Sequence, residues 1–338
     1  MLLREVFYKR ERETLSPYAM LCENSKGRRT PIEESDMRTE YMRDRDRIIH
    51  CKAFRRLKDK TQVFINPEGS HYRTRLTHTL EVAQISRTIA RCLALNEDLT
   101  EAAALGHDLG HTPFGHAGEV AITQFYRENN IDLEFWHNEQ SLRIVDTLEN
   151  GKGLNLTYEV RDGILNHKKS RTPETLEGMA VNFADRIAYL NHDIDDALRA
   201  GIITIDDLPK ECMDILGRGH SERLNTMITD IVEQSFGKPK LCMSKDVAWA
   251  TDRLREYMFQ EVYVGSPAKE EEKKVKDVIF LLMEYYMKHP EALPEDERIH
   301  IERDGLMVCI ADYIAGMTDK FAVMKFQEFF VPHGWALL

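Results

Sequence analysis

The chain has 338 residues, enough to bury one large hydrophobic core or two smaller ones. Its formal net charge of −11, with 42% hydrophobic and 30% charged residues, indicates an acidic globular protein and argues against a disordered, fibrous or non-specific nucleic-acid-binding chain. The six cysteines form no CxxC pair and no apolar run approaches the ~20 residues that span a bilayer, so we expect a cytoplasmic protein without a zinc ribbon or membrane segment.

The N-terminal part of the chain is basic although the whole is acidic. Residues 1–75 carry 18 Lys and Arg against 12 Asp and Glu. This excess would suit a polyanionic ligand such as a triphosphate, while a solvated helix face explains the charge equally well. The first 38 residues are polar and contain a loop at Lys26–Pro31, so we expect poor order there.

Most of the remaining chain has apolar residues at helical spacing. Capping residues place the helix starts, with Asp98 as one N-cap and Thr172–Pro173 at the start of the longest helix. Strand signals are sparse and neither GxGxxG nor GxxxxGK is present, so we expect an all-α protein. The predicted helices cover residues 43–60, 76–95, 98–108, 118–130, 138–150, 158–166, 172–201, 221–236, 246–263, 270–289 and 302–319.

The densest group of metal-binding and proton-transferring side chains lies in residues 103–119, AALGHDLGHTPFGHAGE. Adjacent helical residues point about 100° apart, so His107 and Asp108 reach one ion only near a helix end or in a cleft. His78 and Asp185 offer further donors from two other predicted helices. Each histidine alone is more often structural, but together the two nitrogen and two oxygen donors suit a divalent ion with open positions, as a phosphoester hydrolase requires.

The longest predicted helix carries a polar stripe beside its apolar seam. Asp185, Tyr189 and Asp193 are one turn apart and project together. A solvated face would be filled with Lys, Glu and Gln, so this stripe predicts the lining of a cleft. His116 and Glu119 likewise share one helical face, where the carboxylate can orient the imidazole for proton transfer.

These residues resemble the HD superfamily of metal-dependent phosphohydrolases, and more closely the deoxynucleoside triphosphate triphosphohydrolases, the dGTPase family. The resemblance implies an HD-domain helical bundle with additional C-terminal helices. We therefore expect a partly irregular extension over residues 1–42, an HD core over 43–201, and a helical part packed on the core over 202–338. The matching segments are 43–50 (RDRDRIIH), 54–57 (FRRL), 61–64 (TQVF), 73–79 (RTRLTHT), 107–119, 137–141 (HNEQS), 184–189 (ADRIAY) and 312–319 (DYIAGMTD).

The resemblance implies hydrolysis of a dGTP-like substrate to a deoxynucleoside and inorganic tripolyphosphate. It makes His78, His107, Asp108 and Asp185 the ligands of one divalent ion, whether Mn, Mg, Fe, Zn, Co or Ni. An apolar wall at the 2′ position would leave a ribose hydroxyl unpaired. The other implied roles are proton transfer by His116, Glu119 and His137, phosphate contacts by His111, Arg75, Arg186 and Tyr189, and sugar contacts by Gln62, Val63 and Asp193.

Two other classes of function stay open: another HD phosphohydrolase, acting as a nucleotidase or phosphodiesterase, and a nucleotide-binding regulatory module with little turnover. Retention of all four predicted ligands and of the His116 and Glu119 pair argues against the regulatory module. The resemblance also implies a homo-oligomer, with hexamers among the family's forms. Single-stranded nucleic acid is not indicated as a partner.

Overall fold

The computed structural model describes residues 3–33, 35, 37–62, 73–264, 270–332 and 334. These residues form helices joined by loops, and among them there is no strand, only two isolated bridges that pair Arg28 with Thr157 and Thr61 with Thr74. The expected all-α class is therefore confirmed. No helix in this part of the chain is both long and apolar enough to cross a membrane.

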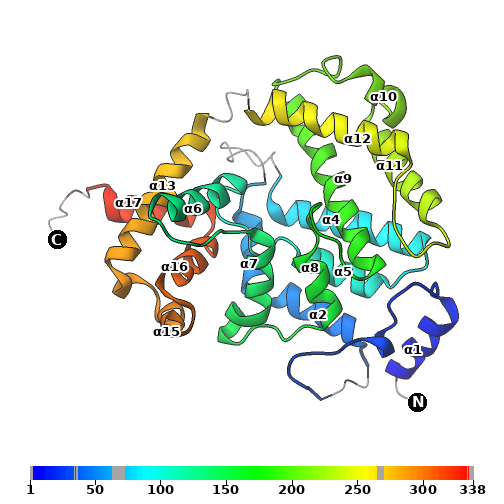
Figure 1. The fold of residues 1–338 in the computed structure, drawn as a ribbon, viewed down its shortest axis with the longest axis horizontal. Helices are drawn as coiled ribbons and strands as arrows, with labels where there is room; N and C mark the ends of the chain where they lie inside the picture. The colour runs from blue at the N-terminus through cyan, green and yellow to red at the C-terminus, as the bar shows by residue number, and fades with distance from the viewer. Residues whose placement is uncertain are drawn as a thin grey trace.

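Figure 1 shows the helices in chain order from blue to red. They are α1 (Leu3–Thr14), α2 (Glu40–His50), α3 (Lys52–Arg56), α4 (Arg75–Cys92), α5 (Glu97–Gly106), α6 (His116–Glu128), α7 (His137–Arg143), α8 (Tyr158–Leu165), α9 (Leu176–Arg199), α10 (Lys210–Leu216), α11 (His220–Ser235), α12 (Lys245–Met258), α13 (Glu270–Lys288), α14 (Glu295–Arg298), α15 (Ile301–Asp304), α16 (Leu306–Ala315) and α17 (Asp319–Phe330). Short 3₁₀ or π turns cover Cys22–Asn24, Leu57–Asp59, Ile144–Leu148, Glu149–Gly151, Phe259–Val264 and Pro290–Ala292.

Two predicted helix starts are wrong because a nearby residue makes the cap. Asn96, not Asp98, caps α5, since its side chain accepts a hydrogen bond from the Leu99 backbone N–H. α9 begins after Thr175, whose hydroxyl accepts from the Gly178 N–H, rather than at residues 172–173. Both ends of a helix are set by such side-chain contacts, which periodicity does not locate.

The expectation of poor order before residue 38 is also wrong for the residues described there, 3–33, 35 and 37. This segment contains α1, and its Arg28 side chain is buried against the carboxylates of Glu40 and Asp44. Asp44, fully buried, also accepts hydrogen bonds from the backbone N–H and the hydroxyl of Thr157, at 2.8 and 2.7 Å. The buried guanidinium is thus neutralised by carboxylates inside the protein.

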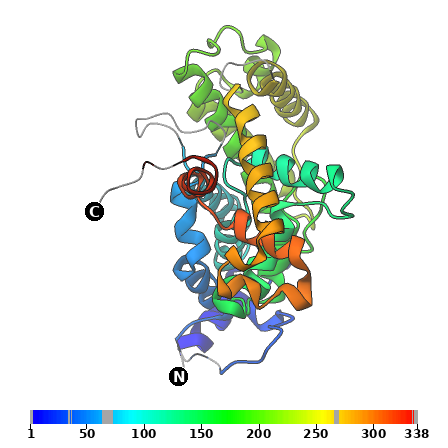
Figure 2. The ribbon, with the colours of Figure 1, turned by 90° about the vertical axis from the view of Figure 1, so that its left-hand side faces the viewer.

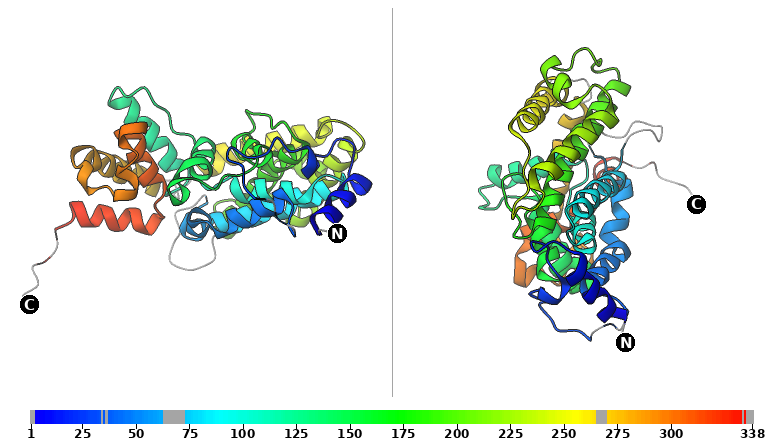
Figure 3. Two further views of the ribbon diagram at one scale, coloured as in Figure 1. Left: turned by 90° about the horizontal axis from the view of Figure 1, so that it is seen from below. Right: turned by 90° about the vertical axis from the view of Figure 1, so that its right-hand side faces the viewer.

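Two hydrophobic clusters hold the helices together. The first packs α4 against α5 and α9, with α2, α8 and α10 to α12 around them. The second joins α6 to α13, α16 and α17, with Ile122, Phe125, Ile279 and Met283 all fully buried. In Figure 1 and the left view of Figure 3, α13 and α16 are grouped with α6 at one end of the longer body that contains α4 and α9, and in Figure 2 α13 lies in front of that body.

Candidate metal centre and the surrounding cavity

A cavity of about 1110 Å³ lies where the two groups of helices meet. Its lining comes from α4, α6, α7, α9, α12 and α13 and from the loops beside them. From the described part of residues 1–75, Gln62 and Arg75 reach it. Asp185, Tyr189 and Asp193 all line it from α9, on the stripe that sequence analysis assigned to a cleft.

His78, His107, Asp108 and Asp185 come together at this cavity. His78 Nε2 lies 3.1 Å from Asp185 Oδ1 and 3.9 Å from Asp108 Oδ2. His107 Nε2 lies 3.6 Å from Asp108 Oδ1 and 3.8 Å from Asp185 Oδ1. Donors that share one ion at bond lengths of about 2.0–2.2 Å stand roughly 3–4 Å apart. Donor atoms of His78, His107 and Asp108 all lie within 4.8 Å of one another, and Asp185 approaches this group through the two imidazoles.

Helix packing explains this convergence. His78 lies in the first turn of α4, which Thr74 caps, while His107 and Asp108 follow the last residue of α5. Asp185 lies in the middle of α9, and α4 packs against both α5 and α9. His107 and Asp108 therefore lie just beyond the end of α5, where the side chains of two adjacent residues can face the same point.

His107 supplies a direct test of whether an ion fits. Its Nδ1 donates to the Ala104 carbonyl at 2.6 Å, so its Nε2 carries a lone pair. That nitrogen is buried and has no hydrogen-bond partner. Because an unpaired buried acceptor is costly, a cation at this point would satisfy it, and the donor set of two imidazoles and two carboxylates fits a divalent ion.

A second imidazole supports His78 from behind. His78 Nδ1 lies 3.0 Å from His192 Nε2, and His192 Nδ1 lies 2.8 Å from Asp193 Oδ1. All three residues are buried. Without an ion, His78 Nε2 donates to Asp185 Oδ1 at 3.1 Å. When His78 Nδ1 carries the proton and donates to His192, Nε2 is free to bind a metal, which is the tautomer that a metal ligand needs. Sequence analysis missed His192 in this role.

Glu119 organises a second cluster of imidazoles next to the first. Its Oε2 accepts from His137 Nδ1 at 2.8 Å and faces His116 Nδ1 at 3.4 Å. Burial raises the pKa of Glu119, but the imidazoles of His137 and His116 outweigh it and hold the pKa well below its usual range. The His116 side chain is 74% exposed while Glu119 is buried, so the imidazole faces the cavity on an ionised, buried support.

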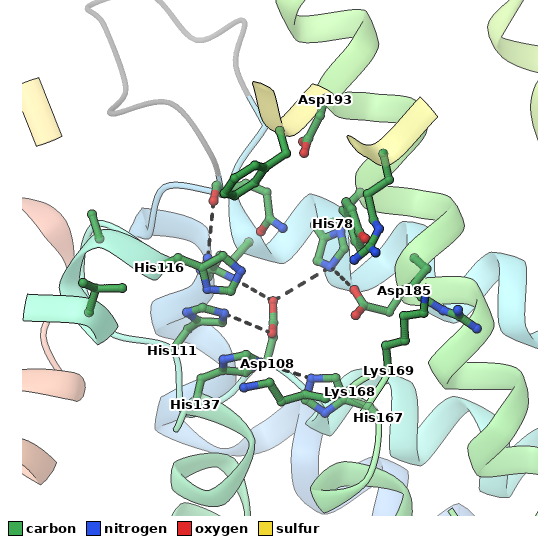
Figure 4. A pocket seen from close by; sticks show the side chains of 18 of the residues that line it. His78, Asp108, His111, His116, His137, His167, Lys168, Lys169, Asp185 and Asp193 are labelled. Atoms are coloured by element: carbon green, nitrogen blue, oxygen red, sulfur yellow. Dashed lines mark hydrogen bonds and ion pairs between the residues drawn. The ribbon is translucent and has the colours of Figure 1, made fainter. Parts of the chain in front are cut away.

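His111 and His167 flank His137. The rings of His111 and His137 stack with centroids 4.1 Å apart, and His111 Nε2 lies 3.7 Å from Asp108 Oδ1. His167 Nδ1 donates to the Ile164 carbonyl, and its Nε2 lies 3.3 Å from His137 Nε2. Burial lowers the pKa of His167 to about 3, so the ring is neutral and its Nε2 carries a lone pair. Figure 4 shows these rings around the Asp108 carboxylate.

Of the predicted substrate contacts, Arg75 is already bonded within the protein, whereas the side-chain oxygen of Gln62 is not. Arg75 is buried and donates to Asp108 Oδ2 at 2.8 Å and to the Gln62 carbonyl at 3.3 Å. Gln62 lines the cavity, and its side-chain Oε1 is buried without a partner. Val63, the predicted wall at the 2′ position, lies outside the described residues.

The outer part of the cavity carries several cationic side chains, together with the carboxylates of Asp252 and Glu256. Arg186 lines it from α9, with its guanidinium 4.5 Å from the centroid of the Phe183 ring. Lys168 lies 3.8 Å from Glu119 Oε1, and Lys169 pairs with Asp252 across the cavity at 2.6 Å. Sequence analysis did not single out the further basic residues that line this part: Lys168, Lys169, Arg253, Arg255 and Lys276.

Residues 75–190 match the HD domain family, and residues 241–328 match the phosphohydrolase-associated domain family. The chain is 54% identical over 336 residues to a deoxyguanosinetriphosphate triphosphohydrolase-like protein of Caldanaerobacter subterraneus subsp. tengcongensis, with 99% of this chain and 98% of that protein covered. It is 46% identical over 344 residues to a protein of the same name from Clostridium tetani, covering 98% and 97%. A phosphohydrolase structure from Bacteroides thetaiotaomicron has a TM-score of 0.52 over 84% of this chain and 69% of that one, and at 17% identity the likeness concerns the fold alone.

Proposed function

The chain belongs to the HD-domain family of deoxyguanosinetriphosphate triphosphohydrolase-like proteins, and on that premise we propose that it hydrolyses deoxynucleoside triphosphates to a deoxynucleoside and inorganic tripolyphosphate. One observation carries the proposal. Four metal-type donors converge beside the His116 and Glu119 pair, in a cavity whose outer part is cationic. A site of this kind can activate water, protonate a leaving oxygen and hold a polyanion at one place.

We assign His78, His107, Asp108 and Asp185 to hold the ion, which we expect to be Mn, Mg, Fe, Zn, Co or Ni. When bound there, a divalent ion polarises a phosphoryl oxygen and lowers the pKa of water. Arg75, fixed against Asp108 at 2.8 Å, then lies where it can donate to the α-phosphate with a second N–H group.

Proton transfer is assigned to His116. Water attacks the α-phosphorus, the bond from phosphorus to O5′ breaks, and O5′ needs a proton to leave as a hydroxyl group. The Nδ1 of His116 faces the ionised Glu119, so its Nε2 is left for substrate. His137 donates to the same carboxylate and fixes its orientation, while His111, stacked on His137, is placed to contact a phosphate oxygen.

The triphosphate is assigned to the cationic part of the cavity. Arg186 and Tyr189 extend from α9, one and four residues beyond Asp185, so the β- and γ-phosphates lead away from the metal donors along that helix. Lys168 and Lys169 face the same space. Neutralising several phosphate charges in a partly enclosed site favours a triphosphate over a monophosphate.

Sugar choice follows from Gln62 and Asp193 if they hold the 3′-hydroxyl while the wall at Val63 offers the 2′-hydroxyl no partner. A ribonucleotide then buries an unsatisfied hydroxyl at a cost of about 1–3 kcal/mol. We expect kcat/KM for dGTP to exceed that for GTP by roughly 5- to 150-fold, since ~1.36 kcal/mol is a factor of ten. Steady-state kinetics with both nucleotides measure the ratio, and equal values would defeat the sugar assignment.

The variant Asp193→Ala tests the contact with the 3′-hydroxyl by removing the protein group that makes it. It should weaken every dNTP without restoring ribonucleotides, because both sugars carry the 3′-hydroxyl, and Asp193→Asn should retain part of the activity through its remaining acceptor. Asp195→Ala is the matched control, since this aspartate lies on the same helix, pairs with Arg199 and does not line the cavity. Equal losses in the Asp193 and Asp195 variants would mean that Asp193 acts only on helix stability.

The product identifies the reaction. Purified protein with each of the four dNTPs and Mg, Mn or Co should release tripolyphosphate and a nucleoside in equal amounts, which phosphorus NMR and chromatography detect. Orthophosphate or a linear monophosphate would indicate the alternative HD phosphohydrolase. Tight nucleotide binding without any product would indicate the regulatory module.

Assembly and location are part of the same proposal. We expect a homo-oligomer, a hexamer being one candidate, which sedimentation of the purified protein measures. We place the reaction in the cytoplasm, because all six cysteines are unpaired and thiols are kept reduced there.

A further inference from the structure

The segment that precedes His116 has an unusual backbone conformation. Residues 111–115, called here the His116 loop, connect the metal donors of α5 to the first residue of α6. Phe114 and Gly115 both have positive φ, 61° and 62°, and a bulky residue such as Phe rarely adopts this conformation. A Cβ added to Gly115 would lie 2.9 Å from Arg75 Nη2 and 3.2 Å from the Gln62 carbonyl. Such a backbone persists only where its surroundings hold it.

A carboxylate from the far end of the chain holds this loop. Asp319, the first residue of α17, accepts from the Phe114 backbone N–H through Oδ1 at 2.9 Å. Its other oxygen, Oδ2, accepts from the Thr61 N–H at 2.8 Å. The Asp319 side chain therefore joins the backbone of Phe114, near His116, to the backbone of Thr61, next to Gln62.

The role of Asp319 differs from that of an ordinary residue at a helix start. The cap of α17 is Thr318, whose hydroxyl accepts from the Phe321 N–H. Both oxygens of Asp319 are directed instead to backbone donors of other segments. A parallel contact lies nearby, where the buried Lys60 side chain donates to the carbonyls of His111 and Ala315.

We propose that Asp319 is a positioning residue for the reaction, which sets the His116 loop and the Gln62 segment against each other from the C-terminal helices. It lies outside the residues that line the cavity, so it acts through backbone contacts and not on substrate. The kinetic consequence rests on the proposed function. The structural consequence, a loop held by the Asp319 carboxylate, can be tested without any substrate.

Hydrogen exchange of the metal-free protein tests the contact itself. In Asp319→Ala the Phe114 and Thr61 amides lose their acceptor, so exchange of peptides covering residues 109–117 and 58–62 should quicken by about tenfold or more. Asp319→Asn keeps one acceptor and should fall between Asp319→Ala and wild type. Thr318→Ala is the matched control: it removes the cap of α17 but leaves both loop contacts, and these peptides should exchange as in wild type.

Kinetics test the consequence. Displacing His116 by a fraction of an ångström should lower kcat by about 10- to 100-fold in Asp319→Ala, with partial recovery in Asp319→Asn and near wild-type kcat in Thr318→Ala. Rates are compared per folded, metal-loaded protein. If Asp319→Ala and Thr318→Ala have equal exchange and equal kcat, Asp319 is only a helix-start residue and the proposal fails. If Asp319→Ala does not fold, the test rests on Asp319→Asn. Exchange and kcat equal to those of the wild type in that variant would refute the proposal. A wild type that hydrolyses no dNTP would refute the proposed function, while the exchange result would still decide the role of Asp319.

Discussion

Replacing Asp185 with alanine is expected to lower the bound metal far below one ion per chain and to reduce kcat/KM by on the order of 10³-fold or more. Asp185 Oδ1 lies 3.1 Å from His78 Nε2 and 3.8 Å from His107 Nε2, so a single oxygen of this carboxylate faces both imidazoles. Stabilisation of phosphoryl charge by a bound ion is worth several kcal/mol, and each ~1.36 kcal/mol is a factor of ten. Metal content after dialysis and steady-state kinetics measure the two effects.

The control for Asp185 lies on the same helix. Asp195→Ala removes a half-exposed carboxylate from α9 without touching the cavity, and it should keep both metal and activity. A second readout needs no turnover: saturating Mn should raise the thermal midpoint of the wild type but not that of Asp185→Ala. Full metal content in Asp185→Ala would remove this carboxylate from the ion's donors.

Replacing His116 with alanine is expected to lower kcat by ~10²–10⁴-fold while metal content stays at the wild-type level, as for loss of a general acid or base. His116 is the imidazole of the Glu119 cluster that is exposed to the cavity, whereas His137 and His111 are buried. Its loss should leave the convergence of the four metal donors intact. Single-turnover rates together with metal analysis separate the two functions.

The control for His116 is Gln124→Ala, two turns further along α6 and also in the cavity lining, which should change kcat little. Unchanged turnover in His116→Ala would exclude His116 from the mechanism. Loss of metal would give it another role, because donor atoms of His111, His116, Glu119 and His137 all lie within 4.8 Å of one another and could hold an ion.

Sequence periodicity was sufficient for the helices that bury a continuous apolar stripe, such as α4 and α9. It did not predict α1, α10, α14 or α17. α10 has only seven residues, too few for a helical period to stand out, and α17 has apolar residues on several faces, Phe321, Val323, Met324 and Phe326 among them. The predicted helix over residues 302–319 is interrupted at Gly305, whose φ of 87° ends α15 and precedes α16.

Part of the site could be predicted because it is local in sequence. His107 and Asp108 are adjacent, and His116 and Glu119 are one turn apart. His192, His167 and Asp319 could not be assigned in this way, because their partners are 114, 30 and 205 residues away and only the packed helices bring them together. The signal for Asp319 was present, since residues 312–319 resemble the family, but nothing local shows that its carboxylate binds another segment's backbone.

The position of α6 makes the two halves of the chain mutually dependent. A fragment ending near residue 201 would keep His78, His107, Asp108 and Asp185, yet α6 would lose α13 and expose Ile122 and Phe125, which are fully buried in the whole chain. Exposing one such side chain costs about 1.5–3 kcal/mol. Such a fragment should therefore be insoluble alone, and co-expressing the rest of the chain as a separate polypeptide should restore its solubility. Cleavage of the backbone between the two halves would then be tolerated, whereas removal of the second half would not.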